Sequence, residues 1–132
     1  AGGAFRNGRR IRTSSAHGLG EALVGTGFPF RRPEELPAYL EDFRRVFSAC
    51  SGIRRGGSAA LDLCYLAQGS LDAFWEGTLA PWDVAAGRVI LAEAGGVATR
   101  REGAPIETTE SGTIVAAGSK ELLEKLRAVL DP

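Results

Sequence analysis

The stretch 71–96, which reads LDAFWEGTLAPWDVAAGRVILAEAGG, constrains the fold of this chain more than any other. Its first residues, 71–75, form the short apolar and aromatic run that is typical of a strand, and a turn is expected at 76–78. Pro81 suits the first turn of a helix, where its missing N–H costs nothing. From 84 to 94 only two residues are charged, and two glycines then end the run. The pattern therefore predicts a strand, a turn and a buried helix, in that order.

Asp83 lies at the expected entrance of this helix, and a carboxylate in that position has two interpretations. It can cap the helix by accepting the N–H two or three residues further on, which stabilises a helix by about 1 kcal/mol. It can also be a metal ligand. The small side chains at 85–87 would let another backbone approach closely. The residues alone leave both interpretations of Asp83 open.

A second feature is a glycine turn in front of a helix. The pattern predicts a short strand at 52–55, a turn through Gly56 and Gly57, and a helix from Ser58 to about Gln68. Ser58 is a favourable N-cap residue. The free N–H groups of a helix start that is reached over glycines also attract anions and hydroxyl groups. The core side of this helix is expected to carry Ala60, Leu63, Cys64 and Ala67.

Two further stretches have the apolar spacing of amphipathic helices. In the helix expected at 33–50, the apolar stripe comprises Leu36, Leu40, Phe43, Phe47 and Cys50. Its solvent-facing side is expected to carry Glu41, Asp42, Arg44 and Arg45. A last helix, capped by Gly118-Ser119, is expected to bury Leu122, Leu123, Leu126, Val129 and Leu130.

The remaining apolar runs, at 22–27, 97–99 and 113–117, have the length and composition of strands. Strand and helix patterns alternate along the chain. This alternation predicts an α/β layered domain with a mixed, largely parallel sheet.

The chain begins with a predicted hairpin that is rich in arginine. Asn7-Gly8 favours a type I′ turn between two short strands, with Phe5 and Ile11 on one face. Four arginines flank the turn. Such a run discourages edge pairing, and no interleaved aromatics support a nucleic-acid surface. The arginines are Arg6, Arg9, Arg10 and Arg12.

Overall charge gives no argument for a nucleic-acid or membrane partner, because 16 Lys and Arg balance 16 Asp and Glu. No apolar run is long enough to span a membrane, and no signal-peptide pattern opens the chain. Cys50 and Cys64 do not form a disulfide framework, which favours buried free thiols in a reducing, cytoplasmic compartment. The single histidine, His17, has no second histidine with which to share a metal.

Four motifs resemble the inositol monophosphatase family, above all its bacterial members. They are FRNG at 5–8, GTGFPF at 25–30, RRGGSAALDL at 54–63, and WDVAAG at 82–87 with Ile90 and EAGG at 93–96. They occur in the order and spacing of that family. The resemblance implies that 1–132 is the C-terminal αβα half of an αβαβα sugar-phosphatase fold, and that an N-terminal metal-binding half is missing. The chain opens on residues that lie in mid-chain in that family.

The resemblance also implies roles for individual residues. Asp83 would bind Mg²⁺ and contact the substrate, and Glu76 would accept hydrogen bonds from substrate hydroxyls. An ionised carboxylate is only an acceptor, which suits a cyclitol. Gly57, Ser58 and Ala59 would contact the sugar-like ring. Thr26 and Gly27 are expected at the edge of the substrate cleft.

The function implied is Mg²⁺-dependent hydrolysis of inositol monophosphate or a related sugar phosphate. The family's Asp-Pro-x-Asp-Gly-Thr motif is absent, so this chain alone is expected to be inactive. Fructose-bisphosphate, histidinol phosphate and nucleotide 3′-phosphates are alternative substrates. A different class of function is a non-catalytic role with the transcription machinery or RNA, as for some bacterial members. The family also implies a homodimer.

Overall fold

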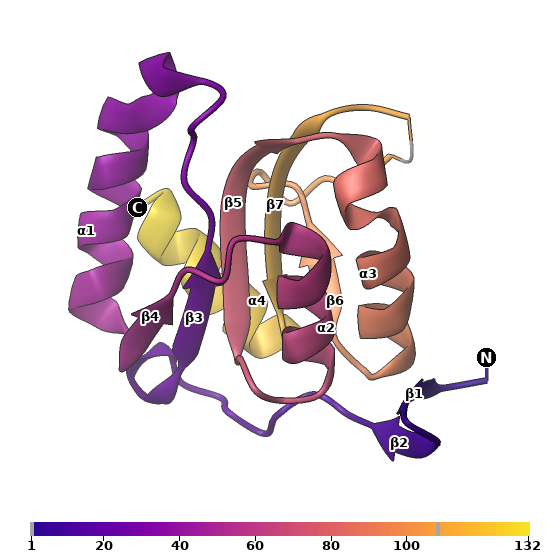
Figure 1. Ribbon diagram of the computed structural model, residues 1–132. Helices are drawn as coiled ribbons and strands as arrows, with labels where there is room; N and C mark the ends of the chain where they lie inside the picture. The colour runs from indigo at the N-terminus through magenta and orange to yellow at the C-terminus, as the bar shows by residue number, and fades with distance from the viewer. Residues whose placement is uncertain (1, 108) are drawn as a thin grey trace.

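The computed structural model describes residues 2–107 and 109–132. The chain forms a small hairpin and a five-stranded sheet flanked by helices (Figure 1). The strands are β1 (Ala4–Arg6), β2 (Arg9–Ile11), β3 (Leu23–Thr26), β4 (Gly52–Arg54), β5 (Ala73–Leu79), β6 (Val97–Thr99) and β7 (Gly112–Ala117). The α-helices are α1 (Leu36–Ala49), α2 (Ala59–Ala67), α3 (Pro81–Glu93) and α4 (Lys120–Leu130), with short 3₁₀ turns η1 (Leu19–Glu21) and η2 (Pro33–Glu35).

The sheet is mixed, with the strand order β4-β3-β5-β7-β6. Strand β3 pairs in parallel with both β4 and β5, whereas β7 pairs antiparallel with β5 and β6. Only β7 therefore opposes the direction of the other strands in this sheet. The mixed, largely parallel α/β sandwich expected from the sequence is confirmed.

Helices cover both faces of the sheet and enclose two cores. Helices α1 and α4 lie on one face and α2 and α3 on the other (Figure 1). Because successive side chains of a strand point to opposite faces, Ala73 and Trp75 join the core under α1 and α4, whereas Phe74 joins the core under α2 and α3. The buried leucines expected in α4 complete the first core.

Several local structures predicted from the sequence are present in the fold. Asn7 and Gly8 have positive φ angles in the hairpin turn. The Ser58 and Ser119 side chains accept hydrogen bonds from N–H groups three residues on, and so cap α2 and α4. Pro81 is the first residue of α3. These interactions join residues that are close in sequence, so local pattern was sufficient to predict them.

The apolar stripe predicted for α1 is wrong. The buried residues of α1 are Tyr39, Asp42 and Val46. Tyr39 stacks on Trp75 with the ring centroids 6.0 Å apart. Asp42 forms an ion pair with Arg101, which lies far along the chain. These contacts turn a different side of the helix toward the sheet. Phe43 and Cys50 are partly buried, and the side chains left exposed are Leu36, Leu40 and Phe47.

The expected hairpin face is also wrong. In the observed register Ala4 lies opposite Ile11 and Phe5 lies opposite Arg10. Phe5 and Ile11 therefore point to opposite faces. Ala4 and Ile11 pack against the core under α2 and α3, while Phe5 is exposed with the Arg10 guanidinium 5.1 Å from its ring centroid.

Three expectations around β5 and its neighbours need correction. The predicted turn at 76–78 lies inside β5, where the pairing with β7 shifts register between Glu76 and Leu79. Helix α3 is not buried all round, since Trp82 is 81% exposed. In α2, Ala60 is exposed and Leu66 takes a core position instead.

Both cysteines are free thiols, and each is half-buried rather than buried. No helix in the described part of the chain combines the length and apolarity that crossing a membrane requires.

Candidate functional site

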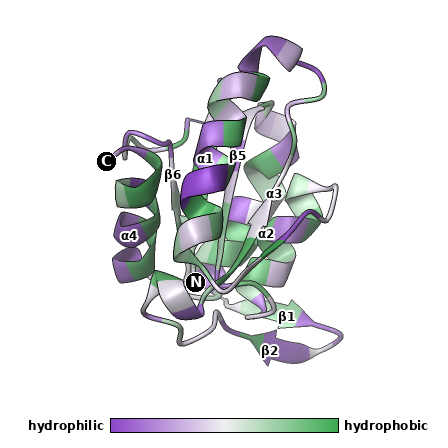
Figure 2. Ribbon diagram, turned by 90° about the vertical axis from the view of Figure 1, so that its left-hand side faces the viewer, coloured by the Kyte–Doolittle hydropathy of each residue, from purple (hydrophilic) through white to green (hydrophobic). Residues whose placement is uncertain are grey.

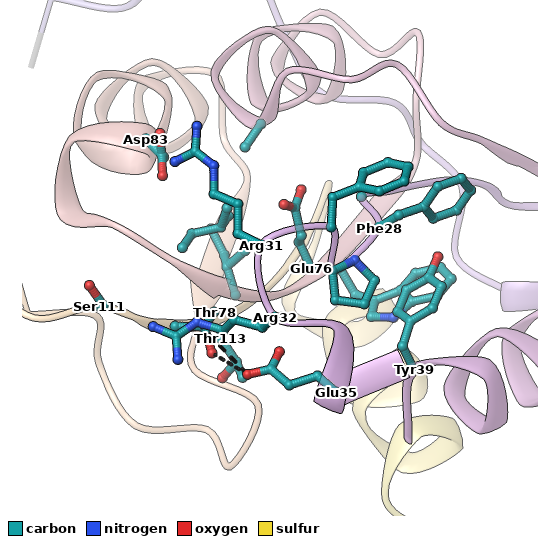
Figure 3. Close-up of a pocket in the computed structure, with 18 of the residues that line it drawn as sticks. Phe28, Arg31, Arg32, Glu35, Tyr39, Glu76, Thr78, Asp83, Ser111 and Thr113 are labelled. Carbon is teal, nitrogen blue, oxygen red and sulfur yellow. Dashed lines mark hydrogen bonds and ion pairs between the residues drawn. The ribbon is translucent and has the colours of Figure 1, made fainter. Parts of the chain in front are cut away.

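The main cleft lies at the end of the sheet where β3 and β5 finish. Its volume is about 1100 Å³. Part of its lining comes from the segments that follow β3, β4 and β5 in the chain, and ligands of open α/β sheets bind outside such strand ends. Figure 3 shows Glu76, Asp83, Tyr39 and Glu35 around this space. The cleft therefore gathers residues that lie far apart in the sequence.

Asp83 is the third residue of α3, after Ala80 as N-cap and Pro81 as the first helical residue. Its Oδ2 accepts the N–H of Ala80 at 3.0 Å. The carboxylate thus reaches back toward the start of its own helix, unlike an N-cap, which bonds forward. Asp83 is half-buried and lines the cleft. Capping uses one of its oxygens, so the same carboxylate can serve the helix and also face a ligand.

The turn before α2 brings three predicted residues to the cleft. Gly57, Ser58 and Ala59 all line it. Gly57 has φ +94°, a conformation that L side chains rarely adopt. Ser58 Oγ accepts the N–H of Leu61 at 3.3 Å, which fixes the first turn of the helix. The start of α2 is thereby held at the cleft wall.

Glu76 lines the cleft from β5, and it is the most perturbed carboxyl group there. Burial, together with the nearby charges of Asp62 and Asp83, raises the pKa of Glu76 to about 7, while Arg55 acts against them. A carboxyl group with this pKa can be neutral or ionised at physiological pH. It can therefore donate or accept a hydrogen bond.

The two residues expected at the edge of the cleft, Thr26 and Gly27, lie in different environments. Gly27 lines the cleft and lies against the Glu76 carboxylate, where a side chain of even one carbon would collide with it. Thr26 is fully buried and its hydroxyl pairs with the Tyr39 hydroxyl at 3.0 Å. Thr26 is not among the residues that line the cleft, so the expectation for it is wrong.

Three residues near the cleft were not identified from the sequence. Asp62 is 4% exposed, and burial raises its pKa to about 6, with Arg55 opposing the shift. The Arg55 guanidinium lies 5.0 and 5.3 Å from the ring centroids of Phe28 and Phe30. Trp75 lines the cleft, and its buried indole N–H has no partner in the described structure. One signal was available for Asp62, because it is the only charged residue of the α2 sequence AALDLCYLA.

Together these groups suit a small, hydroxylated, anionic ligand. Glu76 and Asp83 offer acceptors for hydroxyl groups, and the start of α2 offers N–H groups. Arg31, Arg32 and Arg55 place positive charge along the lining. Within 2–107 and 109–132, no three His, Cys, Asp or Glu side chains gather as a metal site. Asp83 lines the cleft, but it does not form such a cluster with its described neighbours.

Comparison with known proteins agrees with this class of site. The family model described as inositol monophosphatase family matches residues 1–131. The chain is 44% identical over 129 residues to an inositol-1-monophosphatase of Rhizobium meliloti, covering 98% of this chain and 48% of the relative. It is 48% identical over 120 residues to Nus factor SuhB of Pseudomonas aeruginosa, covering 89% of this chain and 44% of the relative.

A solved structure agrees as well. The crystal structure of extragenic suppressor protein suhB from Bartonella henselae matches with a TM-score of 0.90 at 40% identity, covering 98% of this chain and 48% of that one. The chain belongs to the inositol monophosphatase family, as the motifs indicated. It spans about half the length of the curated relatives that it matches.

Proposed function

We propose that this chain supplies the C-terminal half of the active site of a Mg²⁺-dependent phosphatase. The substrate is inositol monophosphate or a related sugar phosphate. The observation that carries the proposal is that Glu76, Asp83 and the turn 57–59 line one cleft, although they come from three separate elements. The family of the chain supports phosphate-ester hydrolysis as the reaction.

Each of these residues has a proposed role that its chemistry allows. Gly57, Ser58 and Ala59 contact the ring of the substrate with groups at the start of α2. Glu76 accepts hydrogen bonds from its hydroxyl groups. Asp83 binds both the metal and the substrate, and the positive end of α3 favours its ionised form. The metal, when bound, supplies an acidified water and charge neutralisation at the phosphate.

The residues present make only part of a magnesium site. Mg²⁺ prefers octahedral oxygen coordination with some waters retained, and Asp83 is one carboxylate. We infer that the other protein ligands come from an N-terminal half, and that this chain alone does not turn over substrate. Exposed apolar side chains on α2 and α3 support a covering partner next to the cleft. Their exposed apolar residues are Leu61, Tyr65, Trp82 and Val89.

A chimera tests this proposal. The N-terminal half of the Rhizobium meliloti relative is placed ahead of this chain, and phosphate release from inositol 1-phosphate is followed with and without Mg²⁺. Turnover is expected only in the chimera and only with the metal. Asp83→Asn should abolish it, whereas Asp131→Asn, at an exposed acid of the C-terminus, should not. Activity of the 132-residue chain by itself, or an active Asp83→Asn chimera, would refute the proposal.

A second candidate is a non-catalytic interaction role with the transcription machinery or RNA. The name Nus factor SuhB carried by one relative favours it. The ribbon of strand β2 in the arginine hairpin is coloured hydrophilic in Figure 2. Asp83→Asn separates the two candidates, because it removes phosphatase activity and leaves a docking surface intact. Loss of a measured RNA or protein interaction on replacing Arg9 and Arg12 with serine, with activity retained, would favour the second candidate.

We also propose that the complete protein is a homodimer that uses the outer side of α1. This side carries Leu36, Leu40 and Phe47, which nothing in the described structure covers. Light scattering of the chimera should give a dimer mass, and Leu40→Asp with Phe47→Asp should give a monomer. A monomeric parent chimera would contradict this part of the proposal. The free thiols of Cys50 and Cys64 are compatible with the cytoplasm.

A further inference from the structure

One positively charged side chain of the cleft, Arg31, has no role in the function proposed above. It lies in the segment 27–35, which connects β3 to α1, and it is one of the residues that line the cleft. Its side chain is exposed, and it forms no hydrogen bond, ion pair or ring contact with any residue that the structure describes. The N–H donors of this guanidinium are therefore available to a ligand.

The other arginines that line the cleft already contact groups of the protein. The Arg55 guanidinium lies over two phenylalanine rings. Arg101 is held by a carboxylate of α1 through two hydrogen bonds. Arg32 Nε lies 4.0 Å from Glu35 Oε1. Among the described arginines of the lining, Arg31 is thus the one that has no partner.

The backbone of this segment determines where Arg31 points. The Pro29 carbonyl accepts the N–H three residues further on at 3.1 Å, which closes a turn with Phe30 and Arg31 at its centre. The Phe30 ring packs edge-to-face against that of Phe28, with the centroids 5.9 Å apart. Figure 3 shows the Arg31 side chain pointing the other way, toward the part of the cleft where Asp83 lies.

Contacts with β5 hold both ends of the segment. At its start, Gly27 lies against the carboxyl group of Glu76. At its end, Thr78 Oγ1 donates a hydrogen bond to Glu35 Oε1 at 3.2 Å. The turn that carries Arg31 is therefore fixed to the same strand that supplies Glu76 to the cleft.

A guanidinium with free donors suits a phosphate group. Its planar fork can donate two parallel hydrogen bonds to two phosphate oxygens, which a single point charge cannot do. The carboxylates of Glu76 and Asp83 would repel such an anion, so a free cation on their side of the cleft favours its binding. Because arginine stays protonated in proteins, its role is to bind charge and not to transfer a proton.

We propose that Arg31 binds the phosphate group of the substrate, the group whose ester bond is hydrolysed. The proposal rests on the proposed function, which brings that phosphate to the side of the cleft where Asp83 lies. The ring of the substrate is left to Glu76 and the turn 57–59. Arg31 is then a substrate-binding residue that supplies positive charge from this chain itself.

The first test uses the 132-residue chain without metal or substrate. The side-chain N–H signals of its arginines are followed by nitrogen-15 NMR while inorganic phosphate is added. The Arg31 signal, assigned by its loss in Arg31→Lys, should shift and saturate at a lower phosphate concentration than that of Arg44. Arg44 is the matched control, because it is an exposed arginine of α1 that pairs with Glu41. An Arg31 signal that responds no more than that of Arg44 would overturn the proposal.

The second test uses the chimera with the N-terminal half of the relative. Arg31→Gln should lower kcat/KM for inositol 1-phosphate by about 10- to 100-fold, the range for a lost hydrogen bond to a charged group. The inhibition constant of inorganic phosphate should rise by a similar factor. Arg31→Lys should lie between the two, because it keeps the charge and loses the fork. Arg44→Gln should change neither constant.

Thermal unfolding separates binding from folding. Arg31→Gln should unfold at the same temperature as the parent, because the side chain contacts no described residue. An unchanged kcat/KM in Arg31→Gln would overturn the proposal. So would a loss confined to fructose 1,6-bisphosphate, because Arg31 would then bind a second phosphate and not the reacting one.

The two proposals can fail separately. A chimera that is inactive on every substrate would refute the proposed function, and the phosphate titration of the chain would still decide about Arg31. An active chimera that is indifferent to Arg31→Gln would retain the phosphatase and reject the role of Arg31.

Discussion

Gly27 and Glu76 fit together so closely that residue 27 cannot carry a side chain without displacing the carboxylate. Gly27 follows β3 and Glu76 lies in β5, and these strands pair in parallel so that Thr26 is opposite Trp75. Gly27 and Glu76 come directly after this pair, so they also lie side by side. The missing Cβ makes the space in which the carboxyl group is buried, and that burial raises its pKa.

Gly27→Ala should push Glu76 toward solvent and lower its pKa from about 7 toward its ordinary value of 4.5, since burial is the largest cause of the shift. Carbon-13 NMR titration of the Glu76 carboxyl group measures this change. Gly18→Ala is the control, because nothing lies within 4 Å of a Cβ there. A Glu76 that still titrates near pH 7 in Gly27→Ala would contradict the steric argument.

Asp42→Asn should destabilise the fold by about 2 kcal/mol in urea denaturation, because it leaves a partly buried arginine without its main counter-charge. Arg101 donates from Nη2 to Asp42 Oδ1 at 2.8 Å and to the Leu130 carbonyl, and so ties α1 to the end of α4. Glu41→Gln is the control on the same helix. Its pair with Arg44 is exposed, so the free energy of unfolding should hardly change. Equal effects of the two changes would argue against a structural role for the Asp42 pair.

Stability should fall as the pH rises from about 5 to about 8. The pKa of Glu76 is raised to about 7 and that of Asp62 to about 6, from ordinary values of 4.5 and 3.8. The folded chain therefore binds more protons than the unfolded chain in this range, and stability is lost as these groups ionise. We expect a loss of roughly 1–3 kcal/mol, with allowance for solvent screening.

Urea midpoints measured from pH 4.5 to pH 8.5 check this loss, and it should shrink in Asp62→Asn. Below about pH 4 the opposite trend should appear, since the pKa of Asp131 is lowered by its bonds to Arg101. A flat profile between pH 5 and pH 8 would show that the two carboxyl groups are solvated.

Gly87→Ala should destabilise the chain by about 1 kcal/mol, although alanine favours helices over glycine by about that amount. A Cβ at residue 87 would lie 2.7 Å from Leu63 Cβ, so α2 and α3 would have to move apart. Thermal unfolding measures the effect. Ala86→Ser, at the exposed neighbouring position, should be almost neutral. If Gly87→Ala instead stabilises the chain, α2 and α3 can move apart without a cost in the free energy of folding.

The comparison of α1 with α4 shows where sequence patterns were sufficient. In α4 one stripe is apolar and the opposite side is charged, so the buried side could be predicted. In α1, apolar residues occur on two sides. The sheet selects Tyr39 and Val46, while Leu40 and Phe47 remain exposed. Spacing alone could not decide between the two sides, because the choice depends on Trp75 and Arg101, which lie far along the chain.

By itself, the sequence determined the caps, the hairpin turn, the alternation of strands and helices, and the motifs of the inositol monophosphatase family. These features depend on residues within a few positions of one another, or on a pattern of residue types. Only the tertiary structure decided that the half-buried Glu76 packs against Gly27, that Asp62 lies beneath the Gly56 turn, and that Thr26 turns away from the cleft. Burial and charge at a site depend on groups that the fold brings together from distant positions, and no local pattern records their distances.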